Sequence, residues 1–155
     1  MAGKIQQELQ QTKPFRNVGE EVLLNIMRTA DVLELKLTDL LKPHGLSPTQ
    51  YNVLRILRGA GKEGASCKDI GSRMLTRDPD VTRMMDRLED RKLIERGRAK
   101  EDRRVVTHSL TADGLHLVNQ LDRPMERLQR DLLRHMAPER LKELIELLEE
   151  IRSAP

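Results

Sequence analysis

Apolar residues recur every three or four positions between residues 18 and 41, and this spacing predicts one long amphipathic helix. Pro43 and Gly45 follow directly and should end it. The first 17 residues are polar and contain Pro14, so we expect a loose arm or a frayed helical start there. The apolar positions that define the helix are Val22, Ile26, Ala30, Leu33, Leu37 and Leu40.

Three polar segments in the middle of the chain carry signals for the start of a helix. Ser47-Pro48-Thr49-Gln50 combines a capping serine, a proline in the first turn and a glutamine that closes a capping box. The helix that it starts should end at residues 59–61, where glycines occur. Ser66 and Asp69 can cap a second, short helix, and Asp78-Pro79 predicts a third, with Asp78 as its cap.

The third of these helices is amphipathic. Its apolar stripe consists of Val81, Met84 or Met85, and Leu88. Two short helices followed by this one indicate a helix-turn-helix. The polar side chains of its other face are Asp80, Thr82, Arg83, Asp86, Arg87 and Asp90.

Two segments with strand character follow, Leu93 to Arg96 and Val105 to Leu110, separated by a polar loop that starts at Gly97. They should pair as a hairpin. Between positions 96 and 104 five basic residues stand against two acidic ones, so the tip should attract phosphate. The pattern predicts a wing that binds nucleic acid.

The chain should end in two more helices. Thr111 can cap one that runs to about residue 136 with a bend near Pro124, and the other covers 138–151. A helix-turn-helix does not need such long flanking helices with apolar stripes. The simplest explanation is that these stripes are buried against a partner subunit. We therefore expect a mostly α-helical fold of about six helices and a β-hairpin, in a single domain over 1–155. Its expected parts are dimerisation helices over 18–45 and 112–152 and a winged helix-turn-helix lobe over 46–111.

Composition narrows the function. Phe15 and Tyr51 are the only aromatic residues, which argues against a stacking surface for single strands. One cysteine, Cys67, is too few for a disulfide framework or a zinc finger. No apolar run approaches the roughly 20 residues of a membrane span, and no signal-peptide core is present. With no nucleophile–base motif, phosphate loop or metal signature, we expect a cytoplasmic protein that is not an enzyme, has no cofactor and does not bind membranes.

Basic residues concentrate in the middle of the chain. Residues 55–104 carry fifteen Lys and Arg against ten Asp and Glu, whereas residues 113–155 carry seven against nine. The net charge of +3 does not by itself identify a polyanionic partner. A solvated surface of mixed charge is the alternative explanation for the same residues.

The spacing of the wing residues is specific. The segment 102–114 matches the wing pattern of the MarR family of bacterial transcriptional regulators at every defined position. The matching residues are Asp102-Arg103-Arg104, Leu110-Thr111 after five further residues, and Gly114 after two more. Residues 81–89 also resemble that family's recognition helix, and the resemblance covers roughly residues 18–152. It implies an obligate homodimer that places two winged helices on a pseudopalindromic site in double-stranded DNA, most often as a repressor.

The same resemblance assigns roles to individual side chains. Arg104 stands at the position of the wing-tip arginine that reaches the minor groove, while Asp102 would orient the tip rather than touch DNA. Asp78 and Asp80 depart from the family pattern, because they put negative charge at the end of the recognition helix where the helix dipole would favour phosphate. Asp80 would instead pair with Arg77 or Arg83, or accept from a cytosine amino group. Lys92 occupies a turn position where many members have glycine. The predicted DNA-binding set is Arg77, Asp80, Thr82, Arg83, Asp86, Arg87, Arg96, Arg98, Lys100, Arg103 and Arg104.

Many members of the family also bind a small, often aromatic or phenolic, effector between the dimerising helices and the DNA-binding lobe. Residues that could line such a crevice are Met27, Arg28, Tyr51 and Leu54, although core packing explains all except Arg28.

Other functions compete with this one. A winged-helix module that binds proteins instead of DNA is the alternative, and the combination of Arg83, Arg87 and Arg104 argues against it. Cys67, beside Lys68, raises the hypothesis of thiol sensing, although a partly buried spectator is commoner. The histidines lack close ligand spacing and predict no metal site: His44, His108, His116 and His135.

Overall fold

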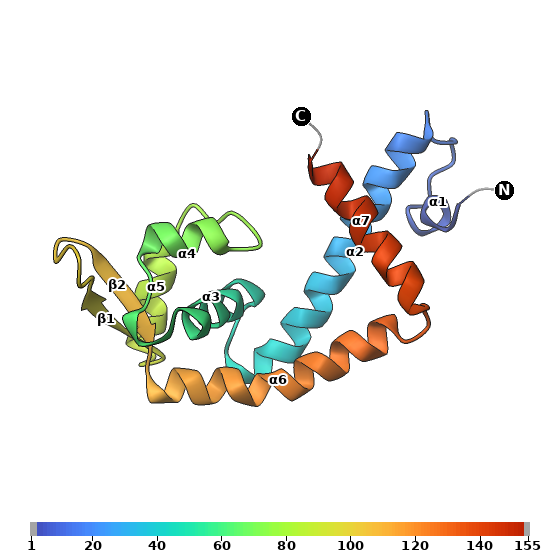
Figure 1. Cartoon of the computed structure of the whole chain (residues 1–155). Helices are drawn as coiled ribbons and strands as arrows, with labels where there is room; N and C mark the ends of the chain where they lie inside the picture. The colour runs from blue at the N-terminus through green and yellow to red at the C-terminus, as the bar shows by residue number, and fades with distance from the viewer. Residues whose placement is uncertain (1–2, 154–155) are drawn as a thin grey trace.

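The computed structural model describes residues 3–153 and places them mostly in helices, with one two-stranded antiparallel hairpin (Figure 1). A lobe formed by α3, α4, α5 and the hairpin lies at one end of the long helix α6, and α7 follows from the other end. The expected mostly α-helical winged helix-turn-helix is confirmed. The elements are α1 Lys4–Glu8, α2 Val18–Leu41, η1 Lys42–His44, α3 Pro48–Ala60, η2 Gly61–Glu63, α4 Cys67–Arg73, α5 Val81–Asp90, β1 Ile94–Arg98, β2 Val106–Leu110, α6 Ala112–Leu133 and α7 Pro138–Ser153.

Side-chain caps start most of the helices of the lobe. Ser47 and Gln50 form the predicted capping box of α3, and Ser66 and Asp69 form that of α4. Helix α3 ends at Gly61, whose φ of 67° lies in the left-handed region that glycine adopts without strain. These local signals lie within four residues of each other, which is why the sequence predicted them.

The start of α5 was predicted two residues too early. Helix α5 begins at Val81, and Asp78 does not cap it. Instead the Asp78 carboxylate accepts the N–H of Asp80 at 2.8 Å, a turn across two residues that competes with helical capping. Asp78 and Pro79 therefore belong to the turn between α4 and α5.

Strands β1 and β2 pair antiparallel, with Ile94 opposite Leu110 and Arg98 opposite Val106. We had expected the loop to start at Gly97. Strand β1 instead extends one residue further, to Arg98, because Gly97 pairs with Thr107. A further bridge joins Ala65 to His108 of β2 and ties the hairpin to the segment before α4.

One apolar core holds the lobe to α6. Its fully buried members come from the end of α2, from α3, α4 and α5, from the start of β1 and from α6. Helix α6 starts at the predicted Thr111 cap, passes through Pro124 without interruption and ends at Leu133, three residues before the predicted end. The largest fully buried side chains are Leu41, Leu54, Leu57, Ile70, Met85, Leu88, Ile94 and Leu121.

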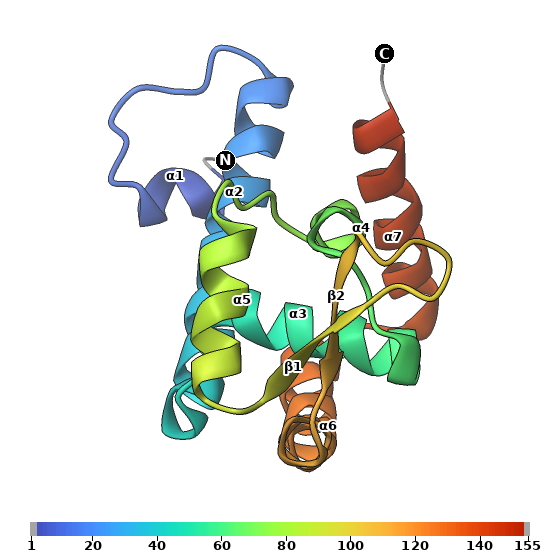
Figure 2. The same cartoon turned by 90° about the vertical axis from the view of Figure 1, so that its left-hand side faces the viewer.

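Apolar side chains of α2 and α7 remain uncovered. Helix α7 has no buried residue, and Ile145 and Leu147 are more than half exposed. On α2, Leu23 and Met27 are 58% and 67% exposed. The two helices overlap in Figure 1 but stand apart in Figure 2, so they do not cover each other.

The N-terminal arm contains a short helix, α1, rather than loose chain throughout. Ile5 on this helix is buried, and α1 packs beside α2. In the part of the chain that the structure describes, no helix is long and apolar enough to cross a membrane.

Candidate nucleic-acid interface

The hairpin loop presents Arg104 to solvent in a defined orientation. The Asp102 carboxylate accepts from the backbone N–H of Arg104 at 3.0 Å and from its Nε and Nη2 at 3.1 and 3.2 Å. These hydrogen bonds from Arg104 lower the pKa of Asp102, so the carboxyl stays ionised near neutral pH. The side chain of Arg104 nevertheless remains 91% exposed. Asp102 thus forms an ion pair with Arg104, and its role in orienting the tip, which the family resemblance implied, stays a prediction.

The loop itself is ordered by its backbone. The N–H of Ala99 donates to the carbonyl of Val105, and the N–H of Val105 donates to that of Asp102, both at 3.0 Å. Arg98 lies directly before this loop and Arg103 within its turn, and both are exposed. The tip is a compact basic surface.

The half-exposed side chain of Arg96 contacts α5. Its Nη2 donates to Asp86 at 3.1 Å and to Glu89 at 2.9 Å, so β1 and α5 are joined by ion pairs. Both Arg96 and Asp86 were predicted to contact DNA, and both are already engaged with each other.

Lys100 is engaged in a similar way. Its Nζ lies 2.9 Å from Glu63 of η2, and this hydrogen bond raises the pKa of Lys100 and lowers that of Glu63. Both side chains are exposed, so the pair contributes little to stability. It links the wing to the turn before α4.

The first turn of α5 forms the second basic surface. Arg83 pairs with Asp80 at 3.7 Å, which is one of the two pairings expected for Asp80. Thr82 and Arg87 are exposed on the same helix, and Arg77 is exposed in the turn before it. A shallow depression of about 130 Å³ lies between α5 and the start of α3, lined by Ser47, Gln50, Asp80, Arg83, Met84 and Arg87.

Figure 1 places α5 and the hairpin loop at the same end of the molecule, away from α7. In Figure 2, which views this end, α5 and the loop lie on opposite sides. The structure therefore brings the two predicted groups of basic residues to one end of the molecule, on opposite sides of it.

Cys67 sits beside a buried histidine. Its Sγ lies 4.0 Å from Nδ1 of His108, and Nε2 of His108 has no hydrogen-bond partner in the described chain. Burial raises the pKa of the Cys67 thiol and lowers that of His108, because it disfavours the charged form of each group. A raised pKa disfavours the reactive thiolate and argues against thiol sensing. Among residues 3–153 no group of three or more His, Cys, Asp or Glu side chains is placed to hold a metal ion.

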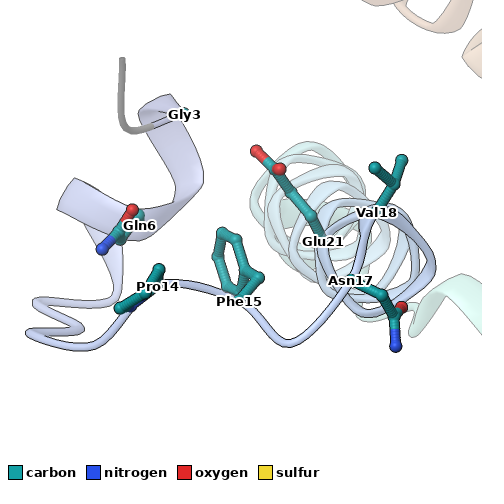
Figure 3. Close-up of a pocket in the computed structure, with 7 residues that line it drawn as sticks. All are labelled: Gly3, Gln6, Pro14, Phe15, Asn17, Val18 and Glu21. Carbon is teal, nitrogen blue, oxygen red and sulfur yellow. The ribbon is translucent and has the colours of Figure 1, made fainter.

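The residues that could line an effector crevice differ in their surroundings, and the effector site stays unassigned. Tyr51 and Leu54 are buried in the core, whereas Met27 is exposed on α2 and Arg28 pairs with Glu8 and Asp31. A different cavity, of about 540 Å³, lies between the N-terminal arm and α2 (Figure 3). It is lined by Gly3, Gln6, Pro14, Phe15, Asn17, Val18 and Glu21.

Two arginines outside the predicted set tie the lobe to the long helices. Arg58 of α3 donates to both carboxylate oxygens of Asp122 on α6, at 2.8 and 3.0 Å. Arg91, directly after α5, donates to the backbone carbonyls of Gly45 and His44 at 2.6 and 3.1 Å. Their partners lie at least 46 positions away in the sequence, so no local pattern could have revealed them.

Comparisons with known proteins agree on one family. The model of the MarR family matches residues 44–105. A MarR transcription factor from Planctomyces limnophilus is 38% identical, over 87% of this chain and 98% of that one, with a TM-score of 0.67. The transcriptional regulator MhqR of Bacillus subtilis is 33% identical over 78 residues, which make up 50% of this chain and 52% of MhqR. The chain thus spans about half the length of the curated relatives it matches first.

The DNA complex of MepR from S. aureus has the same fold. It is 22% identical to this chain, with a TM-score of 0.74 over 83% of this chain and 93% of MepR.

Proposed function

Because the chain belongs to the MarR family of transcriptional regulators, we propose that it is a homodimeric repressor that binds a pseudopalindromic site in double-stranded DNA. The observation that carries this proposal is the wing tip, where Asp102 contacts an exposed Arg104 in a hairpin that lies at the same end of the molecule as α5. An ordered, exposed arginine suits the narrow and electronegative minor groove.

In this proposal α5 enters the major groove and the wing follows the adjacent minor groove. Thr82, Arg83 and Arg87 are exposed on α5 and would meet base edges or phosphates. Arg98 and Arg103 would add phosphate contacts beside Arg104. Arg96, Asp86 and Lys100 would act mainly by holding the wing in place, because their charges are already paired within the lobe.

A second copy of the chain would cover the apolar faces of α2 and α7. Burial of such side chains contributes about 25 cal/mol per Å², so exposed leucines and isoleucines on two helices favour association. We assign 18–45 and 112–152 to dimerisation and 46–111 to DNA binding. A small aromatic or phenolic effector, which the family resemblance suggested, would then bind at a site that the second subunit completes.

Fluorescence anisotropy on labelled duplexes tests the function. A duplex from the region upstream of the protein's own gene is compared with a scrambled duplex in about 0.15 M salt, where non-specific attraction is screened. A preference of roughly a thousandfold for the native duplex would support a sequence-reading regulator. Equal weak binding to this duplex, and to every site selected from a random library, would instead favour the protein-interaction module.

Arg104→Ala tests the wing in the same assay. It should weaken binding to all duplexes by about tenfold, or roughly 1.4 kcal/mol. It should also make the slope of log K against log salt shallower by about 0.9 for each arginine removed. Arg16→Ala, in the arm before α2, removes the same charge from an exposed site and serves as the control. An unchanged affinity and slope in Arg104→Ala would contradict the wing assignment.

A further inference from the structure

Arg91 joins the end of α5 to η1, the turn that follows α2. It is the residue directly after α5, and its guanidinium donates from Nη1 to the carbonyl of Gly45 at 2.6 Å and from Nη2 to that of His44 at 3.1 Å. These carbonyls close η1, the 3-10 turn that follows α2 without a break. The contact therefore spans from the proposed recognition helix to a proposed dimerisation helix.

The carbonyls at this turn are suited to an arginine. The last carbonyls of a helix lack partners within the helix and carry a partial negative charge. Gly45, with φ at 66°, turns the chain so that its carbonyl and that of His44 both face the guanidinium. The planar, two-pronged guanidinium can bind both at once, which the single ammonium of a lysine cannot do in the same geometry.

The apolar packing of α5 on the lobe is less directional than the hydrogen bonds of Arg91. Two of its three buried side chains are Met84 and Met85, and methionine is flexible enough to repack as its surroundings move. The third, Leu88, lies one turn before Arg91. Apolar packing therefore holds α5 in the lobe, while the two hydrogen bonds of Arg91 hold its end against η1, the turn that continues α2.

We infer that Arg91 is a positioning residue that sets the spacing between the two DNA half-sites that the dimer accepts. This inference rests on the proposed function, because α2 is a fixed frame only if two copies pair through it. Within such a dimer, the direction and distance of each α5 from the twofold axis depend on how α5 is attached to α2. Inserting one base pair between half-sites moves them apart by about 3.4 Å and rotates one against the other by about 35°.

The test compares tolerance to spacing in the wild type and in Arg91→Ala. A palindromic site is selected from a random duplex library with the wild-type chain, and duplexes with one base pair added or removed at its centre are prepared. Wild type should lose about tenfold or more in affinity for the altered duplexes, because DNA or protein must be distorted to fit. Arg91→Ala should bind the original site more weakly and distinguish the three spacings by less than about threefold.

Two further variants keep the result interpretable. Arg91→Lys retains the charge but not the fork, so it should tolerate altered spacing as Arg91→Ala does, which separates loss of the fork from loss of the charge. Arg16→Ala should keep the wild-type spacing profile. A spacing penalty in Arg91→Ala and Arg91→Lys equal to that of wild type would overturn the inference while leaving the regulator function intact. Failure of the wild type to select any palindrome would overturn both.

Discussion

Replacing Gly114 with alanine should destabilise the fold, because α6 approaches Leu93, the residue directly before β1, too closely for a side chain at this position. Gly114 is buried in the first turn of α6. A Cβ there would overlap the carbonyl oxygen of Leu93 and lie 3.3 Å from Cδ2 of Leu110. The overlapped oxygen is part of the backbone and also accepts the N–H of Thr111 at 3.1 Å, so it cannot move without disturbing the start of the helix.

The magnitude follows from three contributions. Forcing extra volume into a packed site costs about 1–3 kcal/mol. Weakening the hydrogen bond between Thr111 and Leu93 costs about 1 kcal/mol more. The gain from replacing glycine by alanine in a helix offsets about 0.5–1 kcal/mol. Gly114→Ala should therefore lower the free energy of unfolding by about 1–3 kcal/mol and the Tm by several degrees.

Gly59→Ala is the matched control. Gly59 is also helical, in the last turn of α3, but is exposed, and a Cβ there would meet nothing within 4 Å. The same substitution should stabilise by up to about 1 kcal/mol at this position. Urea unfolding followed by circular dichroism, at one fixed protomer concentration, measures both. If Gly114→Ala unfolded at the wild-type midpoint or above it, the close approach of α6 to Leu93 would be wrong.

Three other changes have definite expected outcomes. Lys92 has φ at 57° in the turn that ends α5, so Lys92→Gly should raise the free energy of unfolding by about 0.5–1 kcal/mol, and a lower urea midpoint would contradict the strain. The pKa of Asp102 is lowered by Arg104, so their contact should persist above the unfolded pKa of about 3.9 and be lost as the pH falls through the lower folded value. A carboxyl titration by NMR should show that the pKa of Asp102 is higher in Arg104→Ala than in the wild type. An unchanged pKa would refute the pairing. Leu144→Asp on α7 should convert the proposed dimer to monomer, because it buries a charge. The control Leu75→Asp changes a loop position that is 88% exposed, and it should remain a dimer. Light scattering that shows a dimer for Leu144→Asp as well would refute the interface.

The helix boundaries that the sequence predicted best are those with a cap. Ser47 and Thr111 each bind a backbone N–H three residues further on, and both helices start where the pattern indicated. The end of α5 also follows a local rule. Lys92 and Leu93 donate to the carbonyls of Glu89 and Leu88 in the arrangement that commonly closes a helix with a left-handed residue.

The errors occurred where two local structures compete for the same residues. Asp78 could cap a helix or close a turn onto Asp80, and both use the same carboxylate. Gly97 signals a loop by its residue type, but pairing with Thr107 keeps it in the strand. In each case the outcome depends on how the segment packs on the rest of the lobe, which a local pattern does not contain.

The composition of the wing could not separate arginines that hold the lobe together from arginines that are free to bind DNA. Arg96 and Arg104 both lie in the basic segment, yet Arg96 binds Asp86 and Glu89 of α5, whereas Arg104 is fixed only by its neighbour Asp102. A phosphate near Arg96 would have to compete with two carboxylates that are already in contact. One near Arg104 would meet a side chain that is held in position and almost fully exposed. Within the basic segment, the free energy of DNA binding should therefore depend more on the loop tip than on the strand that carries it.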